Sequence, residues 1–258
     1  MKRIHLFEIE DLSWFPSFLR NYATDFLQFG ANKFDAYKGS VSLISEALKK
    51  SNTHQIIDIA SGGGGGLLKL AEHLKALHPD LKIKLTDYYP NVPAFKRTCA
   101  LMPEVFEYVE QPVNALNVDP SYKGLRTQFL SLHHFRPNEA ISILNDAVKK
   151  QQSIAIFEAQ QRDVPSFIRM LFSPITLILM TPFIKPFSFL RILFTYLIPI
   201  LPIMVLWDGI VSVLRTYDEA ELKALIDKVD NKDSFEWKIG YTEDKPVKVG
   251  YLIGVPKQ

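Results

Sequence analysis

A run of five glycines near the start of the chain constrains the fold more than any other feature. Gly62 to Gly66 follow an apolar segment, residues 55–59, and precede a segment with leucines at helical spacing, residues 66–77. Glycine accepts the positive φ angles of a tight loop and lets a ligand approach the backbone closely. A helix that starts at such a loop directs free N–H groups at the ligand. This order predicts a nucleotide-type site in an α/β fold, with a flexible glycine linker as the alternative.

The spacing of the small residues separates two kinds of nucleotide ligand. A dinucleotide loop needs glycine at its first, third and sixth positions. Neither register is complete, because Leu67 is sixth when counting starts at Gly62 and Ser61 is first when counting starts one residue earlier. The residues that match a second template, an acid followed by small residues at every other position, are Asp58, Ala60, Gly62 and Gly64. This pattern resembles motif I of the class I S-adenosylmethionine (SAM) dependent methyltransferases.

The resemblance implies that the chain binds SAM through this loop. In the family the acid of motif I, here Asp58, faces the ammonium of the methionine moiety. Ala60 replaces the usual first glycine, and Ser61 lies between it and the glycines. The family often places an acid and an alanine after the third strand, where they meet the adenine. Asn114 and Ala115 occupy those places, and the Asn114 carbonyl can still accept a hydrogen bond.

A second acid follows the next predicted strand at the distance expected for ribose binding. Asp87 directly follows the predicted strand, residues 81–86, and lies about twenty residues after the glycine loop. A carboxylate can accept two hydrogen bonds from the cis-diol of a ribose. Tyr88 or Tyr89 would then pack on the adenine face. The alternative is that Asp87 is an ordinary turn or cap residue.

Apolar segments alternate with helical patterns through most of the chain. The predicted strands are residues 55–59, 81–86, 106–110, 125–131, 153–157, 235–241 and 247–255. The predicted helices between them are residues 66–77, 92–102, 137–150 and a segment that ends near residue 229. We therefore expect an α/β, Rossmann-like, doubly wound seven-stranded sheet with an antiparallel last strand.

Polar side chains follow the fourth and fifth predicted strands, where ligands of open parallel sheets bind. Ser131, His133 and His134 follow the fourth strand, and Glu158 follows the fifth. We expect Ser131 and His133 on the cofactor side. His134 is the first candidate for a catalytic base and Glu158 the second, although Glu158 would equally suit an ion pair with Arg162. The alternative is that both histidines are buried structural residues.

Two further expectations concern this pair of histidines. Two adjacent histidines on an extended chain cannot face the same way, so at most one should reach the reacting centre. We expect no metal site, because no other histidine or cysteine cluster accompanies them.

Residues 167–206 break the alternating pattern with a long apolar, aromatic stretch that contains five prolines. Its two candidate helices, residues 170–184 and 192–207, are too short and too proline-rich for ordinary membrane spans. We expect a helical hydrophobic insertion that covers the site as a lid or lies in a membrane interface. A two-span transmembrane hairpin and a buried insertion are the alternatives. The expected domains are an N-terminal helical cap (1–50), a SAM-binding α/β domain (51–161 and 208–258) and the insertion (162–207).

Composition narrows the classes of partner and compartment. The 258 residues carry a formal charge of +2, from 30 basic and 28 acidic residues, which argues against a nucleic-acid binder. The single cysteine, Cys99, excludes an internal disulfide and fits a reducing compartment. We expect a cytoplasmic protein, either free or peripheral on the inner face of the membrane.

The predicted function is a SAM-dependent methyltransferase that acts on a small hydrophobic acceptor, in solution or at a membrane surface. The resemblance extends to little-characterised bacterial methyltransferase-like proteins with an apolar insert, and it names no acceptor. One alternative is a non-catalytic, membrane-associated protein that binds SAM or lipid. A nicotinamide reductase is a weaker alternative, because the glycine registers fail and a Tyr-x-x-x-Lys pair is missing.

Overall fold

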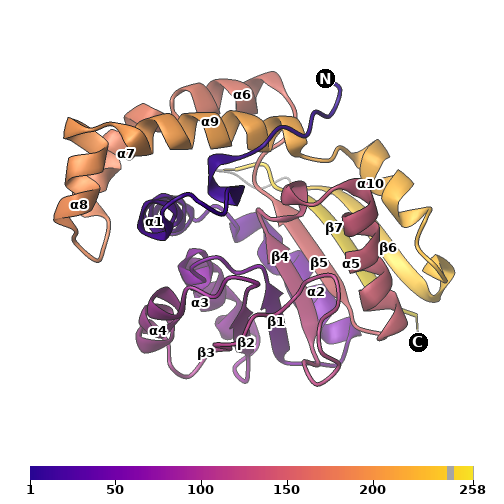
Figure 1. Ribbon diagram of the computed structural model, residues 1–258. Coiled ribbons are helices and arrows are strands. Elements are labelled where there is room, and N and C mark those ends of the chain that lie inside the picture. The colour runs from indigo at the N-terminus through magenta and orange to yellow at the C-terminus, as the bar shows by residue number, and fades with distance from the viewer. Residues whose placement is uncertain (243–246, 258) are drawn as a thin grey trace.

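A seven-stranded sheet forms the centre of the computed structural model, which describes residues 1–242 and 247–257 (Figure 1). The strands are β1 (Gln55–Ile59), β2 (Lys82–Thr86), β3 (Phe106–Tyr108), β4 (Leu125–Phe129), β5 (Ile154–Glu158), β6 (Phe235–Tyr241) and β7 (Gly250–Pro256). Their order in the sheet is β3-β2-β1-β4-β5-β7-β6. Strands β1 to β5 are parallel, whereas β7 is antiparallel to both β5 and β6. The predicted Rossmann-like sheet with an antiparallel last strand is therefore confirmed.

Helices cover both faces of the sheet, as a doubly wound fold requires. On one face lie α2 (Val41–Lys50), α3 (Leu68–Leu77) and α4 (Val92–Leu101), which bury Ile44, Leu74 and Phe95 in one core. On the other face lie α5 (Pro137–Lys149) and α10 (Glu219–Ile226), which bury Leu144 and Leu225 in a second core. The short 3-10 turns are η1 (Ile9–Asp11), η2 (Lys38–Ser40), η3 (Gly65–Leu67), η4 (Leu132–His134), η5 (Thr181–Phe183) and η7 (Lys232–Ser234).

The N-terminal segment passes over the carboxyl ends of the parallel strands (Figure 1). Its main element is α1 (Ser17–Lys33), which starts after Pro16 and packs against the turn η3 of the glycine loop. Leu19 and Phe26 of this helix, and Phe15 just before it, are buried in one core. This helix therefore joins the glycine loop to the helices that follow β5.

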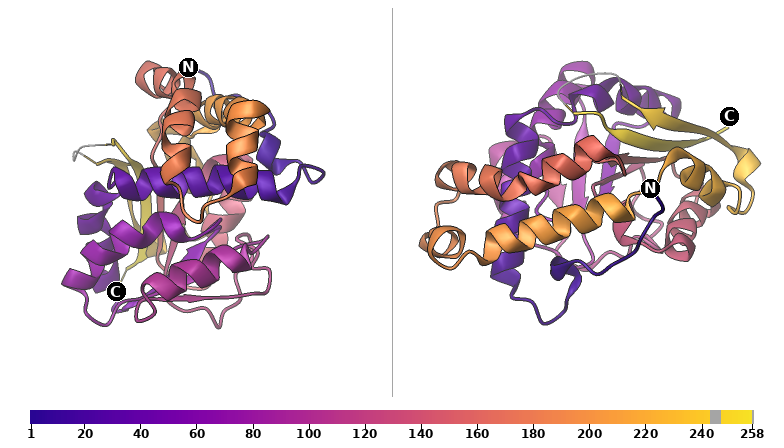
Figure 2. Two further views of the ribbon diagram at one scale, coloured as in Figure 1. Left: turned by 90° about the vertical axis from the view of Figure 1, so that its left-hand side faces the viewer. Right: turned by 90° about the horizontal axis from the view of Figure 1, so that it is seen from above.

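The segment between β5 and α10 forms what we call the helical arm, residues 164–215. It contains α6 (Val164–Leu171), α7 (Ser173–Met180), α8 (Phe189–Ile192), the π-helical turn η6 (Leu193–Leu197) and α9 (Ile200–Arg215). The chain runs out along α6 and α7 and returns along α9, which packs against both (Figures 1 and 2). Leu177, Leu201 and Met204 of the arm share a third core with α1. A buried ion pair between Arg191 and Asp25, 2.5 Å apart, ties the arm to α1.

The arm is more finely divided than the two helices that its sequence suggested. Pro174 lies in the first turn of α7, and Pro199 is the N-cap of α9, so the prolines start new helices. Within the described residues, no single helix has both the length and the apolar composition to cross a membrane. Two pairs of helices reach that length together, with bends of 46° and 76° between their members.

Candidate functional site

The glycine loop between β1 and α3 turns through three left-handed residues. Ala60, Gly62 and Gly64 have φ angles of +63°, +57° and +71°. The two glycines adopt this conformation without strain. At Ala60 the Cβ makes it unfavourable by about 1–2 kcal/mol. Gly64 is also required sterically, because a Cβ there would lie 2.4 Å from Cδ1 of Leu85.

Asp58 lies at the floor of the loop. Its side chain is 2 % exposed and accepts a 2.7 Å hydrogen bond from the hydroxyl of Thr127. Burial is the main reason that the pKa of Asp58 rises to about 7, and the nearby negative charge of Asp87 adds to the rise. A buried acid of this kind gains from a cation placed beside it.

Asp87 lies on the other side of the same loop, at the end of β2. Its Oδ2 atom accepts the backbone N–H of Gly62 at 2.8 Å, and its Oδ1 atom accepts the backbone N–H of Tyr89 at 2.8 Å. Burial raises the pKa of this carboxyl, and the backbone N–H groups oppose the rise. The structure therefore brings Asp58 and Asp87 to one loop.

A cavity of about 570 Å³ opens above the loop, at the carboxyl ends of the parallel strands. A volume of this size is typical of sites for small molecules and cofactors. The predicted site residues that line it are Asp58, Ala60, Ser61, Gly62, Gly64, Asp87, Tyr88, Asn114, Ala115, Ser131 and His134. Glu158 and His133 do not line this cavity. Tyr89 lines it too, but 80 % of its surface remains exposed.

Helix α1 supplies one wall of the cavity that the sequence reasoning did not name. Arg20, Thr24 and Gln28 line the cavity from this helix. A Cβ at Gly63 would lie 1.9 Å from Nε2 of Gln28, so this glycine allows the helix to approach the loop. Asn32 holds the loop by donating from Nδ2 to the Gly65 carbonyl at 2.6 Å. The run of glycines itself was the available signal, since a helix can pack this closely only on residues without side chains.

The Gln28 amide lies against the glycine loop with an unsatisfied donor. Its Nε2 atom is buried and makes no hydrogen bond with any described residue. A buried polar atom without a partner is costly.

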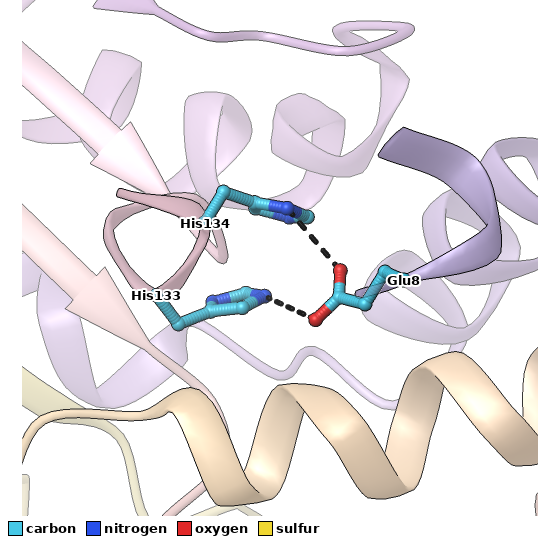
Figure 3. A group of neighbouring side chains, drawn as sticks. All are labelled: Glu8, His133 and His134. Carbon is cyan, nitrogen blue, oxygen red and sulfur yellow. Dashed lines mark ion pairs between the residues drawn. The ribbon is translucent and has the colours of Figure 1, made fainter. Parts of the chain in front are cut away.

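The two histidines lie in the turn η4 and not on an extended chain. Their rings lie side by side, with centroids 4.3 Å apart and an angle of 34° between the planes (Figure 3). The expectation that they face different ways was wrong, because the helical turn rotates successive side chains by much less than the 180° of a strand.

His133 and Glu158 form a buried pair behind the cavity. Nδ1 of His133 lies 2.9 Å from Oε2 of Glu158, and the His133 backbone N–H donates to Oε1 at 3.2 Å. The suggested ion pair between Glu158 and Arg162 does not form. Arg162 instead binds Asp218 and Glu221, at 2.5 and 2.9 Å.

His134 faces an acidic cluster from the N-terminal segment. Its Nδ1 atom lies 3.1 Å from Asp11 and 3.2 Å from Glu8, and its Nε2 atom lies 3.5 Å from Glu10. Burial opposes a charge on the ring, but these carboxylates outweigh burial and raise the pKa of His134 to about 10. Burial raises the pKa of Glu10 to about 7, against the pull of His134.

A second cavity of about 240 Å³ lies beside the first, under the helical arm. Glu10, Leu27, Leu130 and His134 line both cavities. The arm contributes apolar residues such as Met170 and Met204 and the polar residues Arg169, Asp208 and Ser212. Two adjoining cavities can hold a cofactor and a second substrate.

Comparisons with known proteins support the fold but not a particular activity. Neither a family model nor a curated protein sequence matches the chain. Among solved structures, the chain is similar to the plantazolicin methyltransferase BpumL in complex with SAH, with 13 % identity, 93 % of this chain and 88 % of that chain covered, and a TM-score of 0.55. This likeness shows that the chain has the class I methyltransferase fold.

Two further structures align less well. One is an O-methyltransferase family protein from Burkholderia thailandensis, with 16 % identity, 86 % of this chain and 56 % of that chain covered, and a TM-score of 0.48. The other is the O-methyltransferase NcsB1 from neocarzinostatin biosynthesis, with 14 % identity, 84 % and 56 % covered, and a TM-score of 0.46. The chain spans just over half the length of these two proteins.

Proposed function

We propose that the chain is a SAM-dependent methyltransferase that acts on a small hydrophobic acceptor. The observation that carries this proposal is the position of Asp58 and Asp87 on either side of one glycine loop, at the floor of a cavity of about 570 Å³. The loop and its two acids provide contacts for a cationic nucleoside. The class I methyltransferase fold supports the same ligand.

The residues of the cavity fit SAM in charge and in hydrogen bonding. Asp58 would face the ammonium group, and Asp87 would accept the ribose hydroxyls with the lone pairs that its two backbone donors leave free. Asn114 and Ala115 would contact the adenine. The cofactor supplies an electrophilic methyl group, so the protein mainly has to align the acceptor and exclude water.

The second cavity is the proposed acceptor site. Leu27, Leu130 and the methionines of the arm give it an apolar lining, while Glu10 and His134 stand where it meets the first cavity. An oxygen or nitrogen acceptor has to lose a proton there. With a pKa of about 10, His134 carries a proton at neutral pH and cannot act as the base. We therefore assign the base to Glu10, and the role of His134 is to position the Glu10 carboxylate. Glu158, the second candidate from the sequence, is occupied by His133.

The outer surface of the helical arm favours a location at a membrane. Large apolar side chains are exposed along it, with Phe189 and Leu197 exposed by 81 % and 77 %. The others include Phe172, Ile175, Leu179, Phe183, Phe187, Leu190 and Ile203. Exposed apolar surface of this extent is typical of an interaction site. We propose that the arm is both a lid over the acceptor and a peripheral contact with a lipid surface.

Titration calorimetry with S-adenosylhomocysteine on the purified chain tests the proposal directly. We expect binding, and then transfer of a radiolabelled methyl group from SAM to a component of a lipid or quinone extract. Absence of any binding would defeat the proposal. Binding without transfer to any extract would favour the alternative, a non-catalytic protein that binds SAM or lipid at the membrane.

A further inference from the structure

We propose a divalent metal site formed by Glu8, His133 and His134, beside the boundary of the two cavities. One ligand atom from each of the three residues lies within 4.8 Å of the other two (Figure 3). Glu8 comes from the N-terminal segment, and the histidines come from η4, at the end of β4. Two imidazoles and one carboxylate are a donor set that suits zinc and other first-row divalent ions better than magnesium or calcium.

Glu8 presents a buried carboxylate to both histidines. Its side chain is 0 % exposed. Its Oε2 atom faces Nδ1 of His134 at 3.2 Å, and its Oε1 atom faces Nε2 of His133 at 3.9 Å (Figure 3). Oε1 also accepts from the hydroxyl of Ser212 at 3.0 Å and lies 3.3 Å from Arg215. A buried carboxylate is costly unless it is neutralised, and a cation between the three side chains would reduce that cost.

His133 is arranged as metal-binding histidines usually are. A carboxylate can only accept, so the close contact with Glu158 places the ring proton on Nδ1 and leaves a lone pair on Nε2. The contact between Nδ1 and Gln160, at 3.5 Å, is longer. Nε2 lies 3.9 Å from Oε1 of Glu8, with two acceptors facing each other. Histidine ligands commonly have this carboxylate partner on the far nitrogen, which fixes the orientation of the ring.

The charge around the site favours a dication. The carboxylates of Glu8, Glu10, Asp11 and Glu158 contact the two histidines, and Asp208 lines the second cavity together with both of them. In the metal-free chain Arg215 pairs with Glu8 and Asp11, and the His134 ring pairs with Glu8, Glu10 and Asp11. Two ligand atoms on one tetrahedral ion lie roughly 3.4 Å apart, given bonds of about 2.1 Å. The separation of Nδ1 of His134 from Oε2 of Glu8, 3.2 Å, is close to that value. In the metal-free chain Asp11 and Glu8 hold a proton on this nitrogen, and binding of the ion would release that proton.

The position of the site suggests its use, and this step rests on the proposed function. His134 and Glu10 line both cavities, so an ion held by His134 would lie next to the acceptor. An ion with an open coordination position takes an oxygen or nitrogen donor as its further ligand. The acceptor class would then be a hydrophobic molecule with a hydroxyl, carboxylate or amine group, held by that group against the ion.

Binding of Zn²⁺ and Co²⁺ to the full chain tests the site without any turnover. After removal of metals with a chelator, we expect about one Zn²⁺ per chain in equilibrium dialysis, and Co²⁺ should give the visible absorption of a site with nitrogen and oxygen ligands. Mg²⁺ should compete poorly. Failure of the wild-type chain to take up either Zn²⁺ or Co²⁺ would overturn the inference.

Variants separate this site from surface histidines. Glu158→Gln keeps the shape of the pair and should weaken Co²⁺ binding by roughly 10–100-fold, because it changes the partner of His133. Glu8→Gln and His133→Gln should weaken it further. The matched control is His73→Gln, because His73 also pairs with a carboxylate, that of Asp35, at 2.8 Å. Equal Co²⁺ affinity in all four variants would show that the ion binds elsewhere, which contradicts the inference.

A failure of the metal site can be distinguished from a failure of the proposed methyltransferase function. Calorimetry with S-adenosylhomocysteine on the metal-free chain depends on Asp58 and Asp87 and not on Glu8. Binding of the nucleoside without uptake of metal overturns only the metal site. Uptake of metal at Glu8 without binding of the nucleoside supports the metal site and defeats the methyltransferase proposal.

Discussion

The carboxylate of Asp87 accepts the backbone N–H of Gly62 at 2.8 Å. This contact joins the end of β2 to the glycine loop that follows β1. It therefore holds Asp87 close to the loop in the proposed nucleoside site. It leaves Asp87 with free lone pairs on the cavity side, since a carboxylate has about four acceptor positions.

Replacement of Asp87 should weaken nucleoside binding. Asp87→Asn removes the charge and turns one acceptor into a donor, so we expect the affinity for S-adenosylhomocysteine to fall by roughly 10–100-fold, which corresponds to about 1.5–3 kcal/mol for hydrogen bonds to a charged group. Calorimetry measures the change. Asp80→Asn, at an exposed turn before β2, is the matched control and should bind normally. An unchanged affinity in Asp87→Asn would remove Asp87 from the site.

The raised pKa of Asp58 predicts that nucleoside binding depends on pH. Burial raises the pKa of Asp58 to about 7, so the unliganded protein carries a proton there below pH 7. A ligand ammonium favours the ionised form, and binding must then release that proton. Affinity for S-adenosylhomocysteine should therefore fall as the pH drops from 8 to 6. Asp58→Asn should bind weakly at both pH values, and equal wild-type affinity at both would contradict the prediction.

Substitutions at two left-handed residues of the loop, Gly64 and Ala60, should change the stability in opposite directions. Gly64→Ala places a Cβ 2.4 Å from Leu85 at a φ of +71°, and should lower the free energy of unfolding by about 2–4 kcal/mol. Ala60→Gly relieves the strain at φ +63° and should raise it by up to about 1 kcal/mol after the entropy cost of glycine. Urea denaturation measures both. Stabilisation by Gly64→Ala would mean that the loop has a different conformation.

The two arginines beside Asp25 should contribute very differently to the packing of the arm on α1. Arg191 is buried and lies 2.5 Å from Asp25, whereas the Arg97 side chain is 44 % exposed and lies 3.5 Å away. Arg191→Met leaves a buried carboxylate without its main partner and should cost about 3–5 kcal/mol of stability. Arg97→Met, the matched control, should cost less than about 1 kcal/mol. Thermal and urea unfolding test the pair, and similar losses in both variants would contradict the argument.

The apolar surface of the arm predicts binding to lipid vesicles. The wild-type chain should co-sediment with liposomes, and Phe189→Ser combined with Leu197→Ser should reduce the bound fraction because both side chains are almost fully exposed. Leu77→Ser, which alters an exposed leucine at the end of α3, is the control and should bind as the wild type does. If the wild-type chain never co-sediments with liposomes, the arm serves only as a cover for the acceptor.

Local pattern was enough to predict the sheet and the loop. Strands β1, β2, β4 and β5 follow from short apolar runs, and the acids at their ends could be placed because parallel strands end at one edge. The boundaries were less certain: the third strand is Phe106–Tyr108, shorter than the predicted 106–110. The predicted last strand starts at residue 247, whereas β7 starts at Gly250. The arm was predicted as two helices, but it is divided into several shorter ones, because its prolines start new helices.

The sequence by itself determined the α/β sheet and the acid-flanked glycine loop, because strand periodicity and positive φ are properties of neighbouring residues. Only the tertiary structure decided what faces that loop. Helix α1 closes the cavity, and Glu8 meets His133 and His134 from more than a hundred positions away. Contacts of this kind depend on how packed helices bring distant segments together, and no spacing along the chain records them.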